Sequence, residues 1–188
     1  MLGPIIRGTQ IYLAPPQTEY LDTYRRWFAD PAVTRYLLLR NPPSPQQEAE
    51  WLDRIARSDD DVVWAILRTE GDVLIGSTGL HRIDWRHRHA QSGIVIGERE
   101  YWGKGYASEA MRLRTGYAFS ELGLEKVLTS VFDGNIGSRR ALEKAGYRQC
   151  GLLRRHRYFD GRWHDEWMGE LLREEWEAAQ SGEGAVLQ

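Results

Sequence analysis

The 188-residue chain is poor in cysteine, lacks a long apolar run and has no marked excess of either charge. Its one cysteine, Cys150, cannot form an internal disulfide, which agrees with a reducing compartment. No stretch approaches the roughly 18 consecutive apolar residues of a membrane-spanning helix, and the N-terminus lacks the apolar segment of a secretory signal. We therefore expect a cytoplasmic protein without a membrane segment.

The net charge of −2 at pH 7 argues against a broad basic surface for nucleic acid. Hydrophobic residues make up 41% of the chain and charged residues 28%, which is typical of a globular protein rather than a disordered one. The length suits one packed core, and the sequence has neither an internal repeat nor a low-complexity linker. We expect a single domain over residues 1–180 and a disordered tail over residues 181–188.

Hydrophobic periodicity divides the chain into helices and strands. Apolar residues at helical spacing predict about four helices, over residues 18–30, 44–57, 105–121 and 138–146. Shorter runs with strand-like composition predict about seven strands, over residues 10–15, 62–68, 72–80, 90–97, 125–132, 147–159 and 162–172. The last two strands flank Asp160-Gly161, a sequence typical of a tight hairpin turn. This order indicates an α/β or α+β domain with a mixed sheet.

Three polar side chains on these helices allow specific predictions. Ser44 precedes a proline at the start of the second helix and is expected to cap it. Ser138 is expected to cap the fourth helix in the same way. On the third helix, Glu109 is expected to face water, away from a stripe that includes Ala110 and Met111.

The stretch "YWGKGYASEA" over residues 101–110 places two glycines at the start of a predicted helix. Such a turn presents backbone N–H groups and the positive end of the helix dipole to one point, which suits a phosphate. It is not a P-loop, because Lys104 lies between the glycines, and it lacks the third small residue of a dinucleotide-binding turn. Alone, it also fits a helix start that needs glycine only for its backbone shape.

Two further stretches make the pattern more specific. Residues 135–147 read "NIGSRRALEKAGY", and residues 160–176 read "DGRWHDEWMGELLREEW". With these motifs the chain resembles the GNAT superfamily of N-acetyltransferases, and within it the RimJ/RimL-like branch, over nearly its whole length. The glycine turn is similar to that family's acetyl-CoA pyrophosphate turn, Q/R-G-x-G-x-G/A, with Trp102 in the Q/R place.

The resemblance implies the GNAT fold, with a mixed, mostly antiparallel sheet that splays between strands four and five. The strand before the splay would bind the pantetheine amides of acetyl-CoA through its backbone. The glycine turn would bind the pyrophosphate, Asn135 would bind pantetheine, and Ser138 would lie by the thioester sulfur. The implied cofactor residues are Ile94, Val95, Ile96, Trp102, Gly103, Lys104, Gly105, Tyr106, Ala107, Ser108, Asn135 and Ser138.

The resemblance also implies direct transfer of the acetyl group, without a covalent acyl-enzyme. Many GNAT members protonate the departing thiolate with a tyrosine, but this chain has Leu142 in that place. Ser138 is the implied substitute as the catalytic acid.

The general base is left open. RimL-like enzymes carry a glutamate in the first strand of the last hairpin, where this chain has Arg157. A chain of water molecules could relay the proton instead. The other candidates are Glu98, Asp133, Asp165 and Glu166, although Asp165 is better explained as part of the hairpin.

The segment "HRIDWRHRH" over residues 81–89 contains three histidines among three arginines. His87 and His89 could meet a metal, but the flanking cations would repel it and no cysteine assists. We expect no metal, and interpret the segment as a solvated loop beside the acceptor cleft.

Together these observations predict an acetyl-CoA-dependent N-acetyltransferase. The RimJ/RimL resemblance implies a protein or peptide N-terminus as acceptor; the alternative is a small amine, namely a polyamine, an amino acid or an antibiotic. A CoA-binding sensor without activity is a third hypothesis, motivated by Leu142 and Arg157. The resemblance allows a homodimer, and we expect neither a nucleic acid nor a membrane as direct partner.

Overall fold

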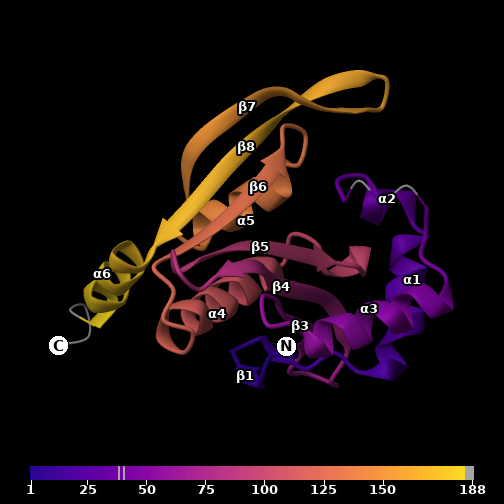
Figure 1. Ribbon diagram of the computed structural model, residues 1–188, viewed down its shortest axis with the longest axis horizontal. Helices are drawn as coiled ribbons and strands as arrows, with labels where there is room; N and C mark the ends of the chain where they lie inside the picture. Colours follow the sequence, from indigo (N-terminus) through magenta and orange to yellow (C-terminus); the bar gives the residue numbers. More distant parts are fainter. Residues whose placement is uncertain (38, 40, 185–188) are drawn as a thin grey trace.

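The computed structural model describes residues 1–37, 39 and 41–184, and its centre is one mixed β-sheet (Figure 1). The strand order is β1-β2-β3-β4-β5-β6-β8-β7, and all neighbours are antiparallel except β5 and β6. The predicted mixed, mostly antiparallel sheet is therefore confirmed, with the two-residue β1 as an additional eighth strand. The bounds are β1 Ile6–Arg7, β2 Ile11–Ala14, β3 Val62–Arg68, β4 Leu74–Asp84, β5 His89–Ile96, β6 Lys126–Phe132, β7 Arg148–Phe159 and β8 Arg162–Leu172.

Helices cover both faces of this sheet. The described residues form α1 (Leu21–Phe28), α2 (Pro31–Thr34), α3 (Pro45–Arg57), α4 (Tyr106–Ser120), α5 (Ile136–Lys144) and α6 (Arg173–Gly184), with single turns η1 (Thr18–Tyr20) and η2 (Arg99–Tyr101). The four predicted helices correspond to α1, α3, α4 and α5, whereas the sequence pattern does not indicate α2 and α6. No helix in the described part of the chain is long and apolar enough to cross a bilayer.

The C-terminal helix α6 extends past the predicted start of the tail. The tail was expected from Ser181, but α6 continues to Gly184. Trp176 packs against Phe119 of α4 with ring centroids 5.6 Å apart, and Arg173 Nε donates to the Leu124 carbonyl over 3.0 Å. These contacts hold α6 on the domain, while residues 185–188 lie outside the described part.

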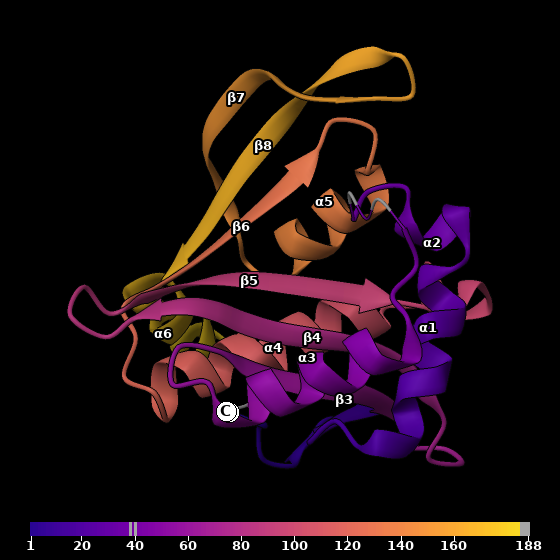
Figure 2. The same ribbon diagram turned by 45° about the vertical axis from the view of Figure 1, so that its right-hand side comes forward.

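The sheet splays between β5 and β6, as the resemblance implies. The two strands pair only where His89–Gln91 face Lys126–Leu128, and beyond that point they separate. Figure 2 shows β6, β8 and β7 turning away from β5 toward the top of the view. In the numbering of this structure the splay follows the fifth strand, because β1 is counted first.

Each face of β5 packs against a different set of helices. Ile94 and Ile96 contact the main core, which α4 shares with β3 and β4. Val95, on the opposite face, contacts a second cluster that α1 and α3 build around Tyr24 and Trp27. The alternation of side chains along a strand therefore directs neighbouring residues of β5 into two separate compartments.

Two predictions about helix ends have opposite outcomes. Ser44 caps α3: its Oγ accepts the Gln47 N–H over 3.2 Å, and Gln47 Oε1 accepts the Ser44 N–H over 2.8 Å. The prediction that Glu109 faces water is wrong, because its side chain is buried. The first turn of α4 lies against the turn between β1 and β2, where the Glu109 carboxylate accepts the N–H groups of Thr9 and Gln10.

Gly97, directly after β5, allows a test of the packing between β5 and α1. A Cβ added at Gly97 would lie 1.9 Å from the Trp27 ring, whereas a Cβ at Gly137 in α5 would meet nothing within 4 Å. We expect Gly97→Ala to displace Trp27 and to lower the free energy of unfolding by about 1–3 kcal/mol in a urea titration. Gly137→Ala should leave stability unchanged or raise it, since alanine is the better helix former. Equal stability of the two variants would contradict this contact.

Candidate active site

A cleft of about 500 Å³ lies between β5, the start of α4 and α5. It brings together every predicted cofactor residue except Lys104, whose ammonium lies 5.6 Å from the Tyr101 ring centroid instead. Two cations of α5 that the sequence analysis did not assign, Arg140 and Lys144, also line it. We call this the cofactor cleft.

The glycine turn gives the cofactor cleft an anion-binding end. Gly103 and Gly105 have φ angles of 73° and 93°, in the region that favours glycine. Gly105 occupies the N-cap position of α4 and offers no side chain to cap the helix, so the N–H groups of the first turn remain available to a ligand. Trp102 fixes the turn, because its Nε1 donates to the Ile96 carbonyl over 2.8 Å.

At the other end of the cofactor cleft, the structure corrects the role of Ser138. The helix α5 begins at Ile136, and its N-cap is Asn135, whose Oδ1 accepts the Ser138 N–H over 3.3 Å. Ser138 lies inside the first turn and is not the cap. Its hydroxyl forms no hydrogen bond to another described residue and lines the cleft.

Behind the splay lies a smaller cavity of about 220 Å³, the splay cavity. It shares Ile94, Asn135 and Ser138 with the cofactor cleft. Leu142, which stands where many GNAT members have a tyrosine, lines it as a buried core residue. The hydroxyl of Ser138 is therefore the candidate proton donor at this end.

A second cleft, of about 720 Å³, opens on the α1 and α3 side of the sheet. It meets the cofactor cleft at Leu37, Ile94 and Val95, which line both. Because the two clefts share this stretch of β5, groups bound in them can meet at one point. We call this second space the acceptor cleft; most of its wall is apolar, including Tyr24, Phe28, Leu37, Pro42, Pro43, Trp51 and Val95.

Two polar groups of the acceptor cleft escaped the sequence analysis. The Glu48 carboxylate of α3 is buried, and this burial raises its pKa while Arg25 acts in the opposite direction. The second group, His81 of β4, bonds Asp61 through its Nδ1 over 3.0 Å. Burial raises the pKa of Asp61, but hydrogen bonds from Ser58 and His81 outweigh it and leave this pKa below its ordinary value.

The acids that the sequence suggested as bases are all held in other contacts. Glu98 accepts from Arg26 Nη2 and Trp27 Nε1, both over 2.8 Å, and Asp133 pairs with His164 Nδ1 over 2.6 Å. None of the four lines either cleft or the splay cavity.

Arg157 and the remaining two acids belong to the hairpin of β7 and β8. Asp165 accepts the Arg155 N–H over 2.7 Å, in keeping with its predicted hairpin role. Arg157 Nε lies 3.1 Å from Glu166 Oε2, so the arginine in the place of the RimL-type glutamate is itself neutralised within the hairpin. The proton acceptor is then a group of another element or a chain of water molecules.

The predicted solvated loop over residues 81–89 is mostly strand, since β4 ends at Asp84 and β5 begins at His89. Asp84, His87 and His89 place potential metal-ligating atoms within 4.8 Å of one another. The Asp84 carboxylate already accepts from the His87 N–H and pairs with the His87 ring, at 2.8 and 2.9 Å. The hydrogen bond from His87 lowers the pKa of Asp84, so this cluster has a structural explanation as the hairpin turn.

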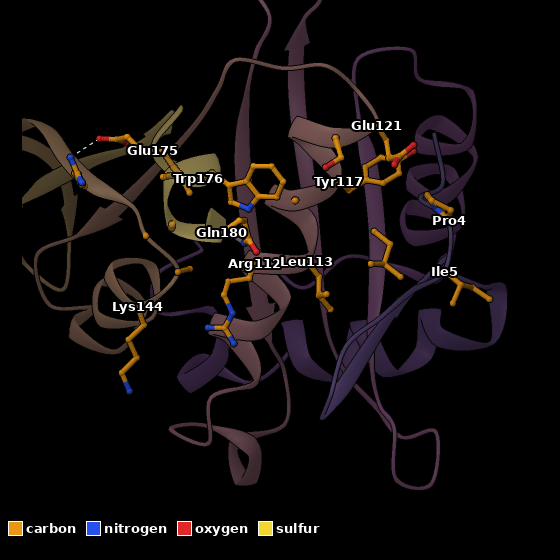
Figure 3. Close-up of a pocket in the computed structure, with 18 residues that line it drawn as sticks. Pro4, Ile5, Arg112, Leu113, Tyr117, Glu121, Lys144, Glu175, Trp176 and Gln180 are labelled. Atoms are coloured by element: carbon orange, nitrogen blue, oxygen red, sulfur yellow. Dashed lines mark ion pairs between the residues drawn. The ribbon is translucent and has the colours of Figure 1, made fainter. Parts of the chain in front are cut away.

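A more voluminous hollow of the described surface is not the candidate site. It measures about 1050 Å³ and lies beside α4, α6 and the N-terminal segment, with Arg112, Tyr117, Lys144 and Trp176 in its wall (Figure 3). None of the predicted cofactor residues lines it.

The two clefts meet at one strand, and comparison with known proteins gives the family of the chain. The model of the acetyltransferase (GNAT) domain matches residues 10–148. The chain therefore belongs to the GNAT family of acetyltransferases; it is an N-acetyltransferase that uses acetyl-CoA. The uncapped first turn of α4, with open space beside Gly103, fits the phosphates of this cosubstrate.

Individual relatives agree with the family. The N-acetyltransferase YoaA of Bacillus subtilis is 32% identical over 86% of this chain and 93% of its own. YdaF of the same organism, named "Putative ribosomal N-acetyltransferase", is 38% identical over 55% of this chain and 56% of its own. The structure of spermidine N-acetyltransferase from Vibrio cholerae with CoA and spermine has a TM-score of 0.83 over 90% of this chain and 99% of its own. At 21% identity it shows the shared fold.

Replacement of Gly105 tests the phosphate end of the cofactor cleft. Gly105→Ala puts a side chain at a positive φ of 93°, beside the N–H groups that face the cleft. We expect CoA to bind about tenfold more weakly, measured by calorimetry. Gly161→Ala is the matched control, because Gly161 also has a positive φ, 73°, and open space around it but lies in the distant hairpin. Both variants should lose about 1 kcal/mol of stability from strain. Equal CoA affinity of the two variants would contradict the assignment.

Proposed function

We propose that this protein acetylates the N-terminal amine of a protein or peptide by direct transfer from acetyl-CoA, as in the RimJ/RimL-like branch. The observation that carries the proposal is the acceptor cleft, which is open, mostly apolar, and joined to the cofactor cleft at Ile94 and Val95. A peptide end brings one amine and an apolar side chain to such a space. The name of YdaF, "Putative ribosomal N-acetyltransferase", supports this acceptor.

The cofactor residues have distinct roles in this proposal. The backbone of Ile94–Ile96, left unpaired by β6, binds the pantetheine amides, and an N–H of this stretch stabilises the oxyanion. The glycine turn and the first turn of α4 bind the pyrophosphate. Asn135 binds pantetheine, and the hydroxyl of Ser138, beside the thioester sulfur, supplies the proton for the thiolate.

The charge of the acceptor cleft favours a peptide N-terminus over a polyamine as the acceptor. Glu48 is its one buried carboxylate among the described residues, and Arg25 lies near enough to lower the pKa of that group. A single carboxylate suits an acceptor with one ammonium, whereas a polyamine needs several. The fold shared with a spermidine N-acetyltransferase keeps a small amine as the alternative acceptor.

A thiol-release assay with a panel of amines tests the proposed function. We expect turnover with peptides that carry a free N-terminus, and higher kcat/KM for them than for spermidine or free amino acids. N-acetylated versions of the same peptides are the matched controls and should be inert. Glu48→Gln should raise KM for peptides about tenfold and leave CoA affinity unchanged, because the lost charge faces only the acceptor.

Two other outcomes of the panel would replace the proposal. Preference for a polyamine or another small amine would establish the alternative acceptor. Tight CoA binding without turnover on any acceptor would instead favour the sensor hypothesis.

Ser138→Ala tests the proton donor. We expect kcat at saturating substrates to fall about 10- to 100-fold, because the thiolate would leave without a positioned acid. Since Ser138 does not cap α5, stability and CoA affinity should change little. Ser181→Ala is the control, because Ser181 is exposed near the end of α6 and lines neither cleft nor the splay cavity. An unchanged kcat in Ser138→Ala would exclude this role.

A further inference from the structure

His81 is the one histidine of the described residues that lines the acceptor cleft, and the proposed transfer does not yet use it. Asp61 Oδ1 lies 3.0 Å from His81 Nδ1, and the side chain of His81 is 39% exposed. The lowered pKa of Asp61 keeps its carboxylate ionised at neutral pH. An ionised carboxylate accepts a hydrogen bond, so in the neutral ring Nδ1 carries the proton and Nε2 presents a lone pair.

The position of Nε2 is set by two glycines on neighbouring strands. Gly79 of β4 pairs with Gly93 of β5, and both lie on the same face as His81. A Cβ at Gly79 would lie 2.7 Å from Nε2, and a Cβ at Gly93 would lie 3.7 Å from it. The imidazole therefore lies over this glycine pair, in space that side chains would otherwise fill.

This glycine pair is next to the stretch where the two clefts meet. Gly93 directly precedes Ile94, which lines the cofactor cleft, the acceptor cleft and the splay cavity. An amine positioned to attack a thioester held along Ile94–Ile96 thus lies beside His81. The four acids considered earlier line none of these spaces, and Glu48 enters the acceptor cleft from α3 rather than from the sheet.

We propose that His81, oriented by Asp61, is the general base of acetyl transfer; this role rests on the proposed function. The amine nitrogen attacks the thioester carbonyl carbon and forms the C–N bond, and His81 Nε2 takes the proton that the nitrogen releases. The C–S bond then breaks, and its electron pair leaves on sulfur, which takes the proton of the Ser138 hydroxyl; the Ser138 oxygen regains a proton from solvent. The imidazolium returns its proton to solvent, so the products are the N-acetyl amine and the free thiol.

The test is kcat as a function of pH, measured with a saturating peptide acceptor. Charged groups near His81 are Asp61, the Met1 amino group that donates to the Asp61 carbonyl, Glu48 in the same cleft, and Arg82 next in the strand. We expect His81→Gln to lower kcat about 100-fold and to abolish the limb of the profile that falls toward acidic pH. Asp61→Asn keeps the imidazole, and should lower kcat less while shifting this limb to lower pH.

Controls make the outcomes distinct. His87→Gln replaces an exposed histidine outside both clefts and should retain wild-type kcat. CoA affinity should be unchanged in His81→Gln and Asp61→Asn, which also shows that both variants are folded. An active wild type with unaffected kcat and pH limb in both variants would overturn the role of His81 alone. A wild type inactive on every amine would overturn the proposed function together with it.

Discussion

The separation of β5 from β6 is the constraint on which the rest of this molecule depends. Strands that part must leave backbone groups without a ladder partner, and such groups are costly when buried. Here side chains replace the ladder at the point of parting. Ser92 Oγ donates to the Leu128 carbonyl over 3.1 Å, and Thr78 Oγ1 and Arg114 Nη1 donate to the Gly93 carbonyl over 2.9 and 3.0 Å.

Arg114 of α4 stabilises the point where the two strands separate. Its guanidinium is almost fully buried and also donates to Thr78 Oγ1 and Tyr147 Oη. Neutral oxygens of β4, β5 and the segment after α5 accept from its Nη1 and Nη2, while its buried Nε has no hydrogen-bond partner among the described residues. Buried charges are tolerated only with such partners. The same contacts fix α4, and with it the glycine turn, relative to the open edge of β5.

After the point where β5 and β6 separate, alternate side chains of β5 point to opposite faces of the sheet, and so toward different parts of the active site. Ile94 and Ile96 extend the core beneath the cofactor cleft, while Val95 turns toward α1 and the acceptor cleft. Because Gly79 and Gly93 have no side chains, the face of the sheet toward the acceptor cleft has room for the His81 ring. Departures from the family pattern have their own explanations, since Leu142 completes the core and Arg157 neutralises Glu166.

Features that arise from neighbouring residues could be predicted from the sequence. The capping box of Ser44, the Asp160-Gly161 turn and the two positive-φ glycines before α4 depend on local hydrogen bonds and backbone preferences, which a short stretch contains. Eight residues of the paired motifs around Gly103 and Asn135 line one cleft, as the sequence predicted, because each motif stays together at its own helix start. Lys104 is the exception, since its flexible side chain turned to Tyr101.

Only the tertiary structure could decide what depends on contacts between distant segments. Glu109 is buried because α4 meets the turn after β1, roughly a hundred residues earlier in the chain. In the sequence, His81 belongs to a segment that resembles a basic loop. In the structure, the register of β4 against β5 places its ring over Gly93, and Asp61 lies beside it. Periodicity shows that alternate residues share a face, but not which face meets the ligand. The sequence by itself therefore determined the family and the cosubstrate, while strand register and helix packing decided which side chains surround the acceptor.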